Sequence, residues 1–212
     1  MDGQHLIYFT DPMCSWCWGF SPVIEAVRAR FGERLPIRLI LGGLRPGTTE
    51  PMTAAAKADV KSHWTHVAEA SGQGFDDAFF EREGFVYDTD PAARATVLVR
   101  REDPDLALDF LRATHEAFYA HNLDVTSPGV LADLSAPFGL GMWAFLAGME
   151  AEDVKQETWR DYAISQRAGV TGFPTLIAGR EGEAYHLIAR GYQGEAAVTA
   201  AIADWLAHQA AA

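Results

Sequence analysis

Apolar residues near the beginning of the chain form short runs that are separated by a longer, helix-like pattern. Residues 5–10 place Ile, Tyr and Phe in one run and predict a short buried strand. Residues 36–42 predict a second strand that ends in a pair of glycines. Between them, apolar residues recur at helical spacing on one face, formed by Phe20, Val23, Ile24, Val27 and Phe31. This part of the chain therefore predicts a strand–helix–strand unit.

The middle of the chain, residues 47–168, has a helical pattern. It is rich in alanine and contains three helix-start signals, in which a capping residue stands before a proline. These signals are Asp90-Pro91, Asp103-Pro104 and Ser127-Pro128. We expect about four to six helices in this stretch and essentially no sheet.

The last part of the chain returns to a mixed pattern. Residues 175–178 and 184–190 predict two strands, and residues 179–182 form the turn between them. Residues 194–208 carry apolar positions at helical spacing and predict a final helix. Connection rules favour one sheet built from both ends of the chain. The simplest assembly is a four-stranded sheet with helices on its faces and a helical insertion.

The composition excludes several classes of partner. The chain has 212 residues and a formal net charge of −12, which disfavours binding to nucleic acid or to anionic lipid. No run approaches the roughly 18 apolar residues that a membrane span needs. The first apolar run, residues 6–9, is too short for a signal peptide, so we expect a cytoplasmic protein without nucleic-acid or membrane partners.

The chain has two cysteines, Cys14 and Cys17, three positions apart where the first helix is expected to begin. A pair this close cannot cross-link distant segments. The free N–H groups and the positive end of the helix dipole point at Cys14, which favours its thiolate and lowers its pKa. We therefore predict that Cys14 is a nucleophile and Cys17 the resolving thiol, with Ser15 and Trp16 tuning the potential of the pair.

Two other interpretations of the cysteine pair remain open. Such a pair is half of a zinc site, and His63 and His66 are imaginable as the other half, although their spacing of two residues is shorter than usual. The pair is also compatible with two buried, inert thiols. We favour the redox interpretation, which requires neither a metal nor a cofactor.

The context of the cysteines adds a family resemblance. The segment Cys14–Cys17 (CSWC) follows the first strand, and Gly169–Thr175 (GVTGFPT) precedes a later one. Together they resemble the thioredoxin superfamily and its DsbA-like branch. The segment Phe9–Phe20 resembles a subgroup of predicted protein-disulfide isomerases and FrnE-type proteins. More distantly, it is similar to kappa-class glutathione transferases and 2-hydroxychromene-2-carboxylate isomerases.

This resemblance implies an α/β thioredoxin fold with a central mixed four-stranded sheet. Residues 1–46 and 169–212 would form the thioredoxin-like domain, and residues 47–168 an inserted all-helical domain. It further implies a cis peptide bond between Phe173 and Pro174, packed beside the cysteines. The backbone of Phe173 would then bind an extended substrate, next to Ser15 and Trp16.

The chain departs from the family pattern at one position. The family often has a buried acid six residues before the first cysteine, and here that position is Tyr8. Asp11 lies nearby, on the turn before the cysteines, and is a candidate site residue. Arg45 follows the second strand and is a candidate for binding an anion such as a glutathione carboxylate, and His63 is a further candidate on a helix near the site.

Three functions are consistent with these observations. The first is a thiol–disulfide oxidoreductase or isomerase that acts on peptides or small thiols. The second is a glutathione-dependent transferase or isomerase on the same scaffold, which needs only one activating residue. The third is a non-enzymatic adaptor that holds a client protein with the helical insertion. The sequence is compatible with a monomer or a homodimer, and it leaves the physiological substrate open.

Overall fold

The computed structural model describes residues 3–211 and contains one mixed sheet. Its strands are β1 (Gln4–Thr10), β2 (Ile37–Leu41), β3 (Thr175–Arg180) and β4 (His186–Arg190), in the order β2-β1-β3-β4. β1 pairs with β2 in parallel and with β3 in antiparallel orientation, and β4 is antiparallel to β3. The prediction of a thioredoxin fold with a mixed four-stranded sheet is therefore confirmed.

Helices surround this sheet and fill the long connection between β2 and β3. The helices α1 (Ser15–Phe31) and α8 (Glu195–Ala211) flank the sheet. The connection holds α2 (Ala54–Ser71), α3 (Asp90–Glu102), α4 (Ala107–Tyr119), α5 (Pro128–Ser135), α6 (Met142–Glu150) and α7 (Glu152–Arg167). Within the described residues no helix is both long and apolar enough to cross a membrane.

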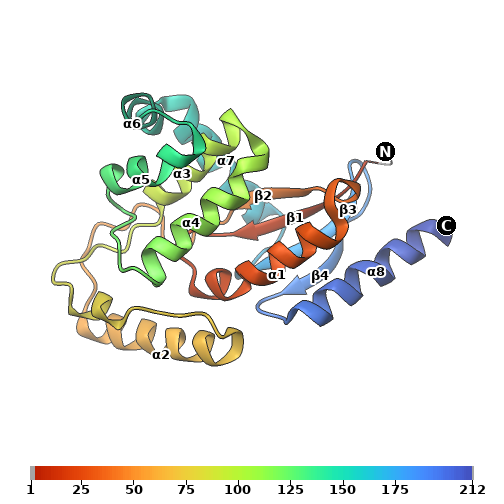
Figure 1. The fold of residues 1–212 in the computed structure, drawn as a ribbon, viewed down its shortest axis with the longest axis horizontal. Coiled ribbons are helices and arrows are strands. Elements are labelled where there is room, and N and C mark those ends of the chain that lie inside the picture. The colour runs from red at the N-terminus through yellow and green to blue at the C-terminus, as the bar shows by residue number, and fades with distance from the viewer. Residues whose placement is uncertain (1–2, 212) are drawn as a thin grey trace.

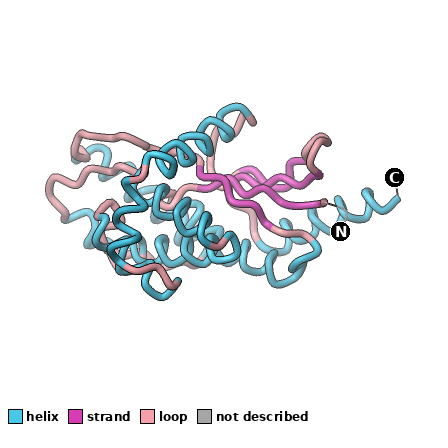
Figure 2. The backbone as a smooth tube through the Cα atoms, turned by 90° about the horizontal axis from the view of Figure 1, so that it is seen from above, coloured by secondary structure: helices cyan, strands magenta, loops and turns pink. Residues whose placement is uncertain are grey.

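The inserted helices pack directly against one end of the sheet and against α1. Figure 1 shows α1 and α8 beside the sheet, with α2 and α4 next to the start of α1 and α7 next to β2. Figure 2, viewed from above, shows the same arrangement, with both ends of the chain on the sheet side. Tyr8 points from β1 toward α1, where its ring lies 6.0 Å from that of Phe20. The first cysteine stands where β1 gives way to α1, at the border between the two parts.

The observed boundaries differ from the predicted ones by one to three residues. β3 extends to Arg180 because Gly179 and Arg180 pair with His5 and Gln4 of β1. The predicted turn is therefore shorter. α3 begins at Asp90, with Thr89 as its N-terminal capping position.

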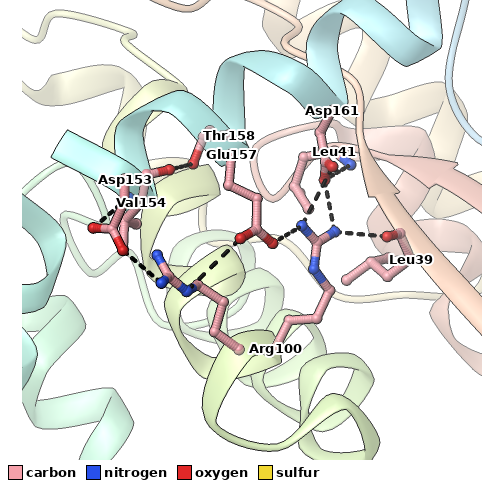
Figure 3. Close-up of polar contacts among 9 residues, drawn as sticks. Leu39, Leu41, Arg100, Asp153, Val154, Glu157, Thr158 and Asp161 are labelled. Carbon is pink, nitrogen blue, oxygen red and sulfur yellow. Dashed lines mark hydrogen bonds and ion pairs between the residues drawn. The ribbon is translucent and has the colours of Figure 1, made fainter. Parts of the chain in front are cut away.

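A buried ion pair joins the inserted helices to the edge strand β2 (Figure 3). Arg100 of α3 donates to Asp161 of α7 at 2.6 Å and to the carbonyl of Leu39 at 2.8 Å. The same carboxylate accepts the backbone N–H of Leu41 at 3.0 Å, and Glu157 accepts from Arg100 at 2.8 Å. Burial raises the pKa of Asp161, and Arg100 opposes that shift. These contacts fix the end of β2 from which the chain enters the site.

Candidate active site

The two cysteines stand at the start of α1 and differ in exposure. Cys14 has extended backbone angles (φ −96°, ψ 115°) and is the N-terminal capping residue, so the free N–H groups of the first turn surround it. Its carbonyl accepts from the N–H of Cys17 at 3.0 Å. Both residues are free thiols. Both are buried, but Cys14 is 7% exposed and lines a pocket, whereas Cys17 is 0% exposed.

The loop before β3 lies against Cys14. The Phe173–Pro174 peptide bond is cis, which is the geometry that the resemblance implies. The Cys14 thiol donates to the Phe173 carbonyl, with a sulfur–oxygen distance of 3.7 Å. The Phe173 ring covers Gly42, where a Cβ atom would lie 2.0 Å from the ring. The end of β2 therefore needs glycine to admit this ring.

A pocket of about 220 Å³ opens above Cys14. It brings together predicted site residues from four separate segments, namely Cys14, Ser15, Trp16, Arg45, His63 and Phe173. Sequence reasoning missed other lining residues, including Leu44, Val60 and Tyr87. No local pattern marks Tyr87, whose hydroxyl donates to the Met13 carbonyl at 2.7 Å and supports the turn before the cysteine.

Two further candidates, Arg45 and His63, line this pocket. The guanidinium of Arg45 lies 5.0 Å from the centre of the Tyr87 ring, in cation–π geometry. Its backbone N–H donates to the hydroxyl of Thr89 at 3.1 Å. His63 projects from α2 and is exposed, whereas His66 is exposed outside the pocket. Arg45 and His63 are thus placed to meet an anionic ligand, and His66 is not.

The tryptophans beside Cys17 have different surroundings. Trp16 is half-buried, lines the pocket, and lies 5.8 Å from the ring of Tyr192. Trp18 is buried, stacks on Tyr119, and donates its indole N–H to the Gly74 carbonyl at 3.0 Å. Trp18 therefore belongs to the packing against the inserted helices, and Trp16 belongs to the pocket wall.

Two effects act in opposite directions on the pKa of Cys14: the start of the helix lowers it, and the neighbouring Cys17 thiol raises it. Hydrogen bonding to the Cys17 thiol raises the pKa of Cys14, burial raises it further, and the Cys17 backbone N–H lowers it. The net direction is upward, opposite to the lowering that the helix start alone favours. The sequence shows where the helix begins but does not show how closely the pair is enclosed.

Asp11 is a buried acid beside the nucleophile, although the sequence marks it only as a turn residue. It is 0% exposed, and its two carboxylate oxygens accept the N–H groups of Met13 at 2.9 Å and Leu44 at 2.8 Å. Burial raises the pKa of Asp11 to about 6, although these hydrogen bonds lower it. The carboxylate ties the cysteine turn to the loop that carries Arg45.

Asp11 and the buried His115 are expected to influence stability in opposite directions between pH 4 and 6. The raised pKa of Asp11 means that its ionisation lowers the free energy of unfolding as the pH rises from 3.8 to about 6. Burial lowers the pKa of His115 from 6.5 to about 4, so its deprotonation raises that free energy as the pH rises. Each effect amounts to about 3 kcal/mol.

We expect Asp11→Asn to remove the first of these two effects. The free energy of unfolding of the variant, minus that of the unchanged protein, should then rise by about 2 kcal/mol between pH 4 and pH 6.5. Urea unfolding of both proteins at several pH values measures this difference. A difference that stays constant across the range would contradict the assignment.

The described residues contain no group of three or more histidine, cysteine or acidic side chains arranged to hold a metal ion. The pocket places His63 near Cys14, but Cys17 lies behind Cys14 and is closed to the surface. The geometry of the pair is thus that of one accessible sulfur with a second sulfur behind it.

Comparisons with known proteins agree with this geometry. Residues 5–202 match the family model described as the DSBA-like thioredoxin domain. A candidate protein disulfide isomerase from Nitrosomonas europaea superposes with a TM-score of 0.90 at 33% identity, covering 97% of this chain and 98% of that one. The cytosolic disulfide reductase DsbM from Pseudomonas aeruginosa superposes with a TM-score of 0.77 at 27% identity, covering 95% and 98%. DsbM has also been solved with GSH.

One group of relatives is described as adapter proteins and not as disulfide enzymes. The ClpXP adapter protein SpxH from Bacillus subtilis (strain 168) is 23% identical over 169 residues, which cover 79% of this chain and 56% of the relative. The chain thus spans about half the length of the curated relatives that it matches.

Proposed function

Since the chain belongs to the DSBA-like thioredoxin domain family, we propose that it is a thiol–disulfide oxidoreductase in which Cys14 attacks and Cys17 resolves. The observation that carries this proposal is the placement of the two sulfurs. Cys14 faces the pocket and lies 3.7 Å from the Phe173 carbonyl, and Cys17 is enclosed behind it. The thiolate of Cys14 attacks a substrate disulfide, and Cys17 then releases the mixed disulfide.

The pocket favours a peptide or a small thiol as the substrate. Its volume of about 220 Å³ suits one side chain with the backbone beside it. The backbone of Phe173 and the Trp16 ring border the place where an extended chain would approach Cys14. Isomerase activity and a cytoplasmic location remain predictions of the same scheme.

A redox titration tests the proposal. We expect glutathione buffers that span a range of redox potentials to convert Cys14 and Cys17 reversibly into one disulfide per chain. The conversion should occur in a single two-electron transition. Mass spectrometry after alkylation measures the free thiols, and insulin reduction in the presence of dithiothreitol measures turnover. A pair that stays reduced at every poise and supports no turnover would contradict the proposal.

A glutathione-dependent transferase or isomerase is a second candidate. The observation in its favour is that the guanidinium-bearing Arg45 and the imidazole-bearing His63 both line the Cys14 pocket. Arginine in particular binds carboxylates such as those of glutathione. Such an enzyme does not require Cys17, so a variant at that position separates the two candidates.

An adaptor role is a third candidate. It is supported by the SpxH relatives and by two exposed tryptophans on the inserted helices. Trp143 of α6 is 83% exposed and Trp159 of α7 is 55% exposed. Affinity capture with a Cys14→Ser/Cys17→Ser protein distinguishes the roles. An adaptor should keep its partners without the thiols, whereas an exchange enzyme should lose the partners that it holds through mixed disulfides.

A further inference from the structure

The side chain of Trp64 on α2 carries a polar group that the folded chain leaves unused. Trp64 is 2% exposed, and its indole N–H has no hydrogen-bond partner among the described residues. Buried donors without an acceptor are uncommon and costly, so this one requires an explanation. An indole nitrogen can only donate, so the group that satisfies it must be an acceptor such as a carbonyl oxygen.

Five aromatic side chains pack around the ring of Trp64 and hold it in place. Their ring centres lie between 4.8 and 6.2 Å from the indole, and they belong to Phe75, Phe79, Phe80, Phe118 and Tyr119. Four of the five are phenylalanines, whose side chains contain no polar atom. The hydroxyl of Tyr119 lies 3.4 Å from that of Tyr87. This cluster therefore positions the indole but supplies no acceptor for its N–H.

Trp64 also lines the pocket of about 220 Å³ that contains Cys14, so an acceptor that enters this pocket can approach the indole. No aspartate or glutamate lines the pocket, although the chain contains 29 of these residues. The lining side chains of Ser15, Trp16 and Arg45 all carry hydrogen-bond donors. The pocket is therefore rich in donors, and a ligand that binds there has to bring the acceptors.

A peptide that is joined to Cys14 brings such acceptors into the pocket. The pocket is shared by Cys14 at the start of α1, Phe173 before β3 and Trp64 of α2. In a mixed disulfide with Cys14, the cysteine of the peptide enters this space, and its backbone carbonyls lie within a few bonds of its sulfur. A small thiol without peptide bonds brings a sulfur but no carbonyl. The unused donor thus distinguishes the two kinds of substrate.

We propose that Trp64 is a specificity-determining residue whose indole N–H donates a hydrogen bond to a backbone carbonyl of the peptide bound at Cys14. This inference rests on the function proposed above and narrows its substrate class to polypeptide disulfides. A hydrogen bond in a buried site is stronger than the same bond in water, and the preformed aromatic cluster fixes the donor before the substrate arrives. Trp64 acts on the binding of the substrate, and the exchange of bonds stays with the two cysteines.

The test compares two disulfides that share a leaving group. One joins thionitrobenzoate to the cysteine of a blocked Ala-Cys-Ala peptide, and the other joins it to mercaptoethanol, which has no carbonyl. The Cys14 thiolate bonds to the sulfur of the peptide or of mercaptoethanol, and the coloured thionitrobenzoate anion leaves. The Cys17→Ala protein limits the reaction to this step. Stopped-flow absorbance measures the second-order rate constant for each disulfide.

We expect Trp64→Phe, made in the Cys17→Ala protein, to lower the ratio of the peptide rate constant to the mercaptoethanol rate constant about tenfold. This change corresponds to the loss of one buried hydrogen bond. The ratio separates this bond from packing, because a general disturbance of the pocket slows both reactions. If a water molecule alone satisfies the N–H, the ratio stays unchanged, and the proposal is overturned.

The matched control is Trp205→Phe in the same Cys17→Ala protein. Trp205 of α8 is 7% exposed, and its indole N–H also has no partner among the described residues, but its neighbour is His186 of β4 and it does not line the Cys14 pocket. Its ratio should equal that of the Cys17→Ala protein. Equal ratios for Trp64→Phe and Trp205→Phe would overturn the role of Trp64 and leave the exchange function intact. A lack of reaction with both disulfides would instead refute the exchange function itself.

Nuclear magnetic resonance tests the same bond without a substitution at Trp64, which matters if Trp64→Phe does not fold. In the Cys17→Ala protein, the indole N–H resonance of Trp64 should move to higher frequency when Cys14 carries the peptide. It should move little when Cys14 carries mercaptoethanol. Equal movements in the two adducts would contradict a hydrogen bond to the peptide.

Discussion

Replacing Cys14 with serine is expected to reduce the rate of disulfide exchange to that of the reaction without protein. Cys14 is the sulfur that reaches the pocket, whereas Cys17 is enclosed and cannot take over the attack. A serine hydroxyl is not a nucleophile for disulfides at neutral pH. Insulin reduction with dithiothreitol measures the loss. A Cys14→Ser protein that keeps its activity would exclude Cys14 as the nucleophile.

The Cys17→Ala variant provides the complementary result. The first attack should proceed, but the mixed disulfide with the substrate should persist because no second thiol releases it. Mass spectrometry of the intact protein detects this adduct. A Cys17→Ala protein that turns over glutathione conjugates at the rate of the unchanged protein would favour the glutathione-dependent candidate.

We expect Arg100→Met to lower the free energy of unfolding by about 3–5 kcal/mol. The substitution leaves the Asp161 carboxylate, which is 4% exposed, without its cation. It also removes the donor to the Leu39 carbonyl. Methionine fills similar space, so the loss arises mainly from the uncompensated buried charge. Chemical denaturation at pH 7 measures the effect.

Two further variants test this explanation. Adding Asp161→Asn to Arg100→Met should recover much of the loss, because asparagine still accepts the N–H of Leu41 but carries no charge. Arg101→Met is the matched control. Arg101 pairs with Asp153 at 2.6 Å on the exposed side of the same helices, so its loss should have little effect. Equal losses for Arg100→Met and Arg101→Met would contradict the role of burial.

Local sequence patterns were sufficient to predict most of the fold. The apolar run at residues 5–10 and the prolines after Asp103 and Ser127 indicate a strand or a helix start from a few neighbouring residues alone. The end of β3 cannot be predicted in this way. Gly179 belongs to the sheet because it pairs with His5, which is far away in the sequence. The division into residues 1–46 with 169–212 and an inserted 47–168 stays a prediction.

The core of the candidate site was predictable because motifs mark it, and Arg45 and His63 were predictable from their place in the chain. The cysteine pair and the Phe173–Pro174 loop have such motifs, and the structure brings them together. Asp11 and Tyr87 have no such motif. Their burial depends on how the inserted helices pack over the cysteine turn, so it arises from contacts between distant parts of the chain.

The unequal exposure of the two sulfurs has a consequence for oxidative damage. Peroxide that enters the pocket meets Cys14 and converts it to a sulfenic acid. Because Cys17 lies directly behind Cys14, it can condense with that group and release water before a second oxidant arrives. The disulfide so formed is reversible by reductants, whereas a sulfinic acid is not. The enclosed thiol is therefore also expected to protect Cys14 from permanent inactivation.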